Sequence, residues 1–172
     1  MGIGSKRSFL PLIFAALVAL PAFASNGDDA AAARSASEKA SKDVLQRLFA
    51  ACPSAKAQLR ATEGFATFSG VGAGASGSGV AKPTRTRIPA YIQFQSAQSA
   101  GGKRDLVFLF ATRDDFSAFA VKGATLGGPA EAGEKGDCSQ GLSPGVRVIQ
   151  LEGSKLVGGD VPSATYSKAK LN

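Results

Sequence analysis

The spacing of apolar residues predicts helices in the first third of the chain. An apolar stripe recurs at intervals of three and four residues from about residue 37, which is the period of one helix face. The stripe consists of Val44, Leu45, Leu48, Phe49 and Cys52. Pro53 ends this helix, and a second short helix is expected before Gly64. Residues 25–36 are small and polar, and are expected to form a flexible leader or the start of the helix.

After Gly64 the pattern changes to that of strands. Segments of strand type are found at residues 65–68, 91–96, 105–111, 146–152 and 155–159. The most apolar of them, 105–111, is expected to be a central strand. Between 70 and 80 glycine alternates with small residues, at positions 70, 72, 74, 77 and 79. This leaves one face of a strand almost bare, so that another strand or an aromatic ring can pack closely. We expect two close-packed strands with a turn near Ser76 and Gly77; a flexible linker is the competing interpretation.

One helix interrupts the strands. Thr112 begins a capping-box-like motif, Phe116 and Phe119 share a helix face, and Gly123 ends the helix. Residues 127–145 are expected to form a long loop, and a short helix is expected from Pro162. The sequence therefore predicts an α+β fold, with N-terminal helices packed on a curved antiparallel sheet or barrel-like sandwich and one inserted helix.

The first 24 residues have the order of a secretory signal peptide. Lys6 and Arg7 precede an apolar run, Pro21 ends it, and Ala22-Phe23-Ala24 fits the small-x-small cleavage rule. The apolar run is shorter than the roughly 20 residues that span a bilayer. We therefore divide the chain into a signal peptide at 1–24, a leader at 25–36 and one domain at 37–172. Removal of the signal lowers the formal charge of +7 by two, to +5.

The composition limits the chemistry available to the chain. It has no histidine and only two cysteines, so histidine-based catalytic triads, histidine-containing zinc sites and iron–sulfur clusters are not expected. We expect no enzymatic activity and no cofactor. Cys52 and Cys138 are expected to pair if the chain is exported, or else to be two separate buried thiols.

Two short patterns resemble ligand sites without the context that such sites need. Residues 72–77 match a dinucleotide fingerprint, but no helix follows and no acid lies about 20 residues further on. Glu131, Glu134 and Asp137 lie close in sequence without the spacing of an EF-hand, and solvated loop charge explains them better than calcium or another metal.

From residue 43 to about 170 the chain resembles the SYLF domain, a lipid-binding module. Residues 59–68 are similar to the helix end and first strand of that family, and 70–80 to its glycine-rich stretch. Residues 106–119 are similar to its apolar strand and short helix. Ser143-Pro144-Gly145, followed by Leu151-Glu152-Gly153, resembles its late signature, and Tyr166 its terminal tyrosine. The resemblance implies binding of lipid headgroups and no catalysis.

The basic residues of two loops are the predicted lipid contacts. They are Lys82, Arg85, Arg87, Lys103 and Arg104. Anionic phospholipid is the expected partner, because a basic residue near an anionic surface contributes about 1 kcal/mol. The two loops are expected either to converge or to lie at opposite ends of the sheet. The competing lipid site is the N-terminal helix, with Lys39, Lys42 and Arg47.

The expected location is the periplasm or the outer membrane, with no nucleic-acid partner. The alternative function is an envelope structural or protein-interaction module without a lipid ligand.

The signal-peptide interpretation makes a direct prediction. When the full chain is exported, intact-mass measurement of the secreted protein should give a chain that starts at Ser25, because cleavage follows Ala24. A secreted chain that still starts at Met1 contradicts the prediction.

Overall fold

A computed structural model describes residues 26–86, 88–98 and 100–171. Within these residues the chain forms three helices and nine strands. The helices are α1 (Asn26–Ala51), α2 (Ala55–Ala61) and α3 (Arg113–Lys122). The strands are β1 (Gly64–Val71), β2 (Ser76–Pro83), β3 (Ala90–Ser96), β4 (Arg104–Phe110), β5 (Ala124–Gly128), β6 (Gln140–Ser143), β7 (Val146–Glu152), β8 (Lys155–Val157) and β9 (Val161–Lys168). The predicted signal peptide lies outside the described residues.

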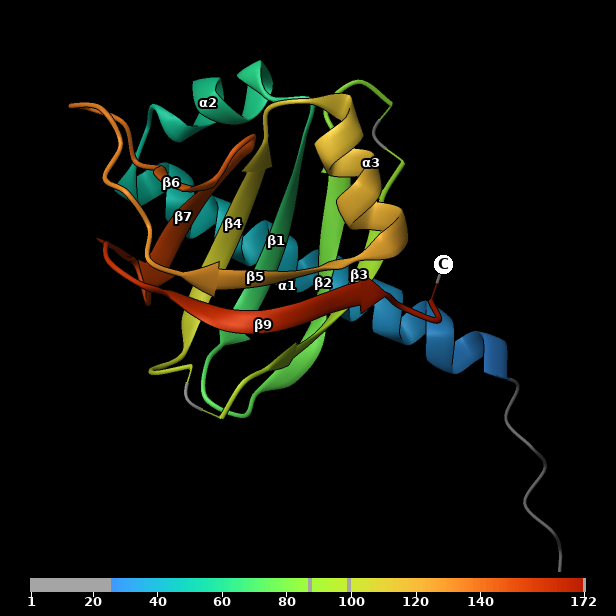
Figure 1. The fold of residues 1–172 in the computed structure, drawn as a ribbon. Coiled ribbons are helices and arrows are strands. Elements are labelled where there is room, and N and C mark those ends of the chain that lie inside the picture. The colour runs from blue at the N-terminus through green and yellow to red at the C-terminus, as the bar shows by residue number, and fades with distance from the viewer. Residues whose placement is uncertain (1–25, 87, 99, 172) are drawn as a thin grey trace, which may run out of the picture.

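The strands form one antiparallel sheet that curls into a nearly closed barrel (Figure 1). Their order is β5-β9-β3-β2-β1-β4-β7-β6, and β8 pairs with β7 beside this path. The gap between the two edges is bridged where Glu131 and Gly141 exchange two backbone hydrogen bonds of 2.8 Å. The predicted α+β fold is confirmed.

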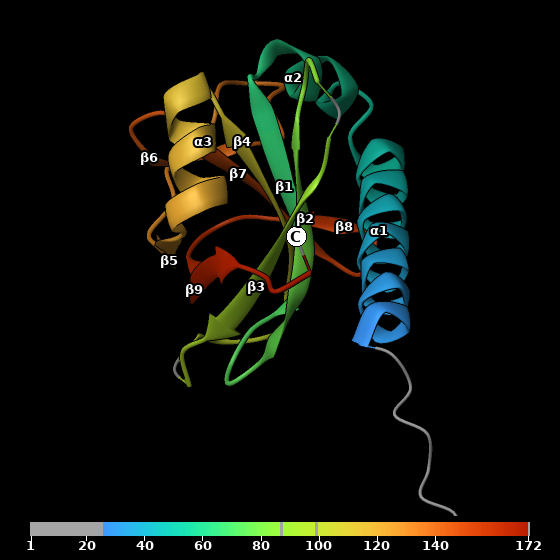
Figure 2. The ribbon, with the colours of Figure 1, turned by 90° about the vertical axis from the view of Figure 1, so that its right-hand side faces the viewer.

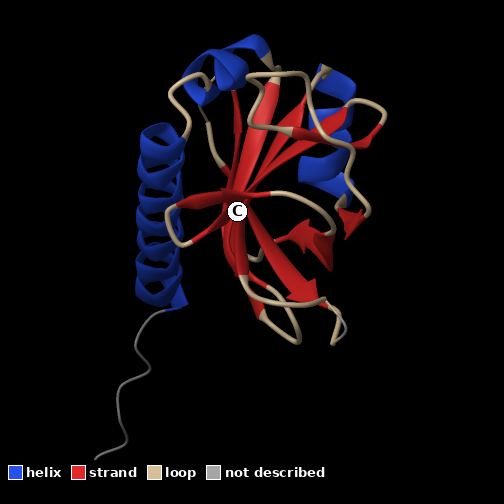
Figure 3. Cartoon of the chain, turned by 90° about the vertical axis from the view of Figure 1, so that its left-hand side faces the viewer, coloured by secondary structure: helices blue, strands red, loops and turns tan. Residues whose placement is uncertain are grey.

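Helices cover both faces of the sheet around β4. Figure 2 shows α1 on the outer side of the sheet and α3 on the opposite side, and Figure 3 shows the same layers from the other direction. Val107 and Leu109 pack outward with Val44 and Leu48 of α1, while Phe108 packs inward. Because both faces of β4 are buried, its sequence is almost continuously apolar, as its predicted central position requires.

The inner core is a cluster of aromatic rings that packs against a strand face without side chains. A Cβ atom at Gly77 would meet the Phe94 ring, and one at Gly79 would meet the Phe68 ring. The Phe68 ring centroid lies 4.6 Å from that of Tyr166 and 5.9 Å from that of Phe94. The predicted close approach of an aromatic to the glycine-rich stretch is confirmed, although the turn between the two strands lies at residues 72–75 rather than near Ser76.

Helix α1 begins at Asn26, so residues 26–36 belong to it rather than to a flexible leader. Small polar side chains in the middle of α1 hold the helix against the sheet. The hydroxyls of Ser37 and Ser78 lie 2.7 Å apart, and Thr67 donates to the Ser41 hydroxyl at 2.6 Å. Because Ser37 and Ser41 are small, the helix can lie close to β1 and β2.

A largely buried ion pair anchors the C-terminal part of α1. Nη1 of Arg47 lies 2.5 Å from Oδ2 of Asp105, which is only 7% exposed. The other carboxylate oxygen of Asp105 accepts hydrogen bonds from the Ser69 hydroxyl (2.7 Å) and the Gly70 amide (2.9 Å). Every oxygen of this buried charge therefore has a partner, as burial of a carboxylate requires.

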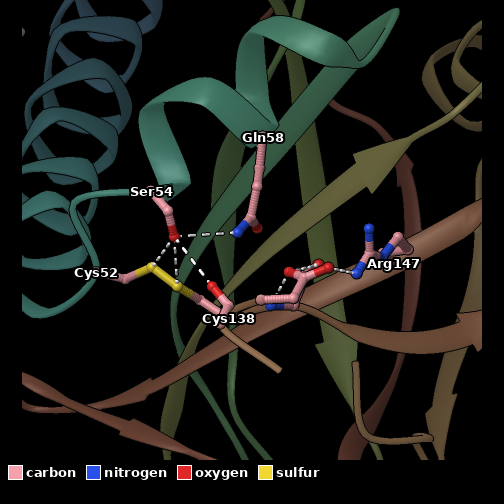
Figure 4. Close-up of polar contacts among 8 residues, drawn as sticks. Cys52, Ser54, Gln58, Cys138 and Arg147 are labelled. Atoms are coloured by element: carbon pink, nitrogen blue, oxygen red, sulfur yellow. Dashed lines mark hydrogen bonds and ion pairs between the residues drawn. A yellow bond between two sulfur atoms is a disulfide. The ribbon is translucent and has the colours of Figure 1, made fainter. Parts of the chain in front are cut away.

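Cys52 and Cys138 form a disulfide, with their Cα atoms 6.4 Å apart, so the predicted pairing is confirmed. The bond ties the end of α1 to the segment before β6, and the Ser54 hydroxyl lies within 3.4 Å of both sulfur atoms (Figure 4). The closed loop is long, since 86 residue positions separate the two cysteines. On the chain-entropy account such a cross-link contributes roughly 4 kcal/mol.

Two expectations about the C-terminal half are wrong. The segment expected as a loop at 127–145 contains the end of β5 and all of β6. The segment expected as a helix from Pro162 is β9, which pairs with β3 and β5. Buried Val161, Ala164 and Tyr166 face the inner core from β9, and these sheet contacts outweigh the local helix signal of Pro162-Ser163.

The contact between β2 and Phe68 gives a stability prediction. In Gly79→Ala the new Cβ would overlap the Phe68 ring and the Thr67 carbonyl, so the free energy of unfolding should fall by about 1–3 kcal/mol. Gly102→Ala is the control, because nothing lies within 4 Å of a Cβ there. Equal denaturation midpoints for the two variants would contradict this packing.

Candidate lipid-binding surface

The basic residues predicted to bind lipid lie at two opposite ends of the barrel. Lys82 pairs with Phe65 at the start of β1, and Arg85 follows in the loop between β2 and β3. Arg104 pairs with Val71 at the other end of β1, and Lys103 precedes it. The six residue steps from Phe65 to Val71 correspond to roughly 20 Å of strand. The two loops therefore do not converge, and Arg87 lies outside the described residues.

Arg104 is held in a hydrogen-bond network and is not available as a free basic contact. Its Nη1 donates to Oε1 of Gln150 and to the Asp160 carbonyl, each at 2.8 Å. The Gln150 side chain is 1% exposed and donates in turn to Oε1 of Gln140 and to the Gly159 carbonyl. Arg104 thus joins β4 to β7 and to the loop before β9, while Lys103 is exposed.

The end of the barrel that carries Lys82 and Arg85 is assembled from α2, the β2–β3 loop and α3. The Phe116 ring of α3 lies where a side chain at Gly64 would stand, so α3 packs directly on the start of β1. Glu63 fixes the loop: its carbonyl accepts from the Thr84 amide at 2.9 Å, and its carboxylate pairs with Arg85 at 3.2 Å. The Thr112 side chain caps α3 by accepting from the Asp115 amide at 3.1 Å.

Two hollows flank the β2–β3 loop at this end. The hollow beside α2 has a volume of about 280 Å³ and is lined by Leu59, Arg60, Phe65, Lys82, Pro83 and Thr84. The hollow beside α3 has a volume of about 320 Å³ and is lined by Glu63, Pro83, Arg85, Thr86, Arg113, Phe116, Ser117, Ala120 and Val121. Their linings contain four basic residues and one acidic residue, so the linings carry an excess of positive charge. We call it the α2–α3 end.

Large apolar side chains are exposed beside these basic residues. Ile88, in the β2–β3 loop, is 74% exposed, and Val121, on α3, is 67% exposed. Val121 lines the same hollow as Arg85 and Arg113. A basic rim around exposed apolar side chains is the composition of surfaces that enter the interface of an anionic membrane.

Helix α1, the competing site, does not present its apolar stripe. Val44 and Leu48 are fully buried against the sheet, and Arg47 is paired with Asp105. Lys39 remains on the surface, where it pairs with Asp43 at 3.0 Å. What α1 offers to a membrane is therefore isolated surface charge without an apolar face.

Sequence reasoning missed two of the basic residues at the α2–α3 end. Arg60 belongs to the last turn of α2 and Arg113 to the first turn of α3, and neither lies in a run of basic residues. Only the fold brings Arg60 and Arg113 to the same end as Lys82.

The titratable groups of the interior have structural roles. Burial in the aromatic core raises the pKa of the Tyr166 phenol, which stays protonated. The hydrogen bond to Glu38 is the main cause of the raised pKa of Tyr91, and desolvation adds to it. Asp137 pairs with Arg147 and accepts from the amide and hydroxyl of Ser139. In the part of the chain that the structure describes, no acidic or cysteine side chains gather as a set of three for a metal ion.

Comparison with known proteins gives no assignment: no family model and no curated protein matches this chain. Among the described helices, none has the length and apolarity needed to cross a bilayer.

The network around Arg104 gives a second stability prediction. Arg104→Ala leaves the buried Gln150 side-chain oxygen without its donor, so the free energy of unfolding should fall by about 1–3 kcal/mol. Lys103→Ala, one residue away, removes the same charge from an exposed position and should change it by less than about 0.5 kcal/mol. Chemical denaturation measures both values, and equal stabilities would show that Arg104 is not part of the framework.

Proposed function

We propose that this protein is exported and binds the surface of anionic phospholipid membranes with its α2–α3 end. The observation that carries the proposal is the placement of Ile88 and Val121, both more than two-thirds exposed, beside the basic residues that line the two hollows. No catalytic activity is part of the proposal.

The energetics of such a surface support binding without a deep pocket. Arg60, Lys82 and Arg113, which form no ion pair with the described residues, each contribute on the order of 1 kcal/mol near an anionic leaflet, and salt screens this contribution. Exposed Ile88 and Val121 add a contribution from apolar area removed from water, which salt does not screen. The two terms together favour anionic over neutral membranes and leave a residual attraction at high salt.

The disulfide supports the export part of the proposal. Cys52 and Cys138 are paired, and such bonds persist in oxidising compartments such as the periplasm. The predicted signal at 1–24 is the route into that compartment. The resemblance to SYLF domains supports the lipid-binding part of the proposal.

Vesicle sedimentation of protein starting at Ser25 tests the proposal. Vesicles that contain phosphatidylglycerol should sediment the protein at low salt, and pure phosphatidylcholine vesicles should not. The variant Arg60→Gln, Lys82→Gln, Arg113→Gln loses about 3 kcal/mol, which is on the order of 100-fold in affinity. The control Lys103→Gln, Lys135→Gln, Lys155→Gln removes the same charge from exposed positions elsewhere and should bind nearly as the parent does.

Two further variants separate the sources of attraction. Ile88→Ser with Val121→Ser should reduce the binding that remains at high salt. Lys39→Gln with Lys42→Gln tests α1, and if that variant alone loses binding, the proposed surface is wrong. If the protein binds neither kind of vesicle, lipid binding is refuted. The alternative function, an envelope interaction module without a lipid ligand, is then favoured.

A further inference from the structure

The hollow beside α2 differs in chemistry from the rest of the α2–α3 end. Three of its lining residues are large and apolar: Leu59, Phe65 and Pro83. Phe65 and Lys82 are direct cross-strand partners in β1 and β2, so their side chains lie on the same face of the sheet. Arg60, one residue after Leu59 in α2, adds a second basic group to the lining. The hollow therefore combines an apolar wall with two cations.

Neither cation is neutralised by a neighbour. Within the described residues, no acidic side chain forms an ion pair with Arg60 or Lys82, whereas Arg85 in the other hollow pairs with Glu63. Thr84 also lines the hollow, but its hydroxyl oxygen is buried and exposes almost no surface. The complement that the hollow offers to an anion is therefore the pair of cations, Arg60 and Lys82.

We propose that this hollow binds a single anionic phospholipid molecule, with the phosphate between Arg60 and Lys82 and the glycerol and first acyl carbons against Leu59, Phe65 and Pro83. The inference rests on the proposed function and specifies one site within it. The volume of about 280 Å³ lies at the low end of small-molecule sites, so it suits a headgroup with its nearest carbons rather than whole acyl chains. The apolar wall disfavours inorganic phosphate, and the unpaired cations disfavour a zwitterionic lipid.

Titration with a monomeric lipid tests the site apart from membrane adsorption. Dihexanoyl-phosphatidylglycerol below its critical micelle concentration should bind saturably to protein starting at Ser25, followed by calorimetry or by NMR shifts of residues 59–65 and 82–84. Glycerol phosphate and dihexanoyl-phosphatidylcholine should each bind at least tenfold more weakly. Arg60→Gln and Lys82→Gln should each weaken binding of the anionic lipid at least tenfold, while Lys103→Gln with Lys155→Gln should leave it unchanged.

The outcomes distinguish this site from the broader function. If anionic vesicles bind the protein and the monomeric lipid does not, the single-lipid site is refuted and membrane binding stands. If glycerol phosphate binds as tightly as the lipid, the apolar wall has no role and the site is one for free phosphate esters. If neither vesicles nor monomers bind, both proposals fail. If Arg60→Gln and Lys82→Gln unfold at the same temperature as the parent protein, their loss of binding comes from the hollow and not from misfolding.

Discussion

The close contact between the Phe68 ring and the backbone of β2 is the constraint on which the barrel depends. The ring occupies the space that a side chain at position 79 would need, and Gly77 gives the same room to Phe94. Since β2 has no side chain on this face at these positions, the sheet can curl until β9 brings Tyr166 against Phe68, with 4.6 Å between ring centroids. Phe119 of α3 then joins the cluster, 6.3 Å from Phe68, and α3 becomes a lid on the inner core. The position of α3, and with it Arg113 and Val121, follows from that packing.

Several of the described arginines hold the fold together, whereas two others form no ion pair with the described residues. Arg47, Arg104 and Arg147 each pair with or donate to groups that are largely buried. A planar guanidinium suits this task because it donates in several fixed directions to carboxylate, amide and carbonyl oxygens. By contrast, Arg60 and Arg113 form no ion pair among the described residues, and both lie at the α2–α3 end. Closeness in sequence was therefore a poor guide to which basic groups share a surface: Lys103 is exposed, whereas the adjacent Arg104 donates to Gln150 and to the Asp160 carbonyl.

Helices and strands were predicted correctly where their local sequence pattern reflects the contacts that they make in the fold. The apolar run of β4, the cap at Thr112 and the bare face of β2 each reflect a contact that the fold makes. Strand β9 was misassigned because Pro162-Ser163 is a local helix signal, whereas its strand character comes from pairing with β3, which lies some 70 residues earlier in the chain. Strands β5 and β6 are short and rich in glycine, and only closure of the barrel defines them. The predicted lipid-binding residues are divided between the two ends of the barrel for a related reason. The direction of a strand decides at which end the next loop emerges, and no local sequence pattern encodes that direction.

Strand and helix directions also connect the predicted processing to the proposed surface. Helix α1 runs along the barrel so that its last residue, Ala51, lies near α2 and its start, at Asn26, lies at the opposite end (Figure 2). Its 26 residues correspond to roughly 39 Å of helix. A leader retained before Asn26 as an anchor would tether the barrel by the end that lies away from Lys82, Ile88 and Val121. The α2–α3 end would then point away from the membrane that holds the anchor. The predicted cleavage after Ala24 would remove this restriction, and the barrel would then be free to turn the proposed surface toward an anionic leaflet.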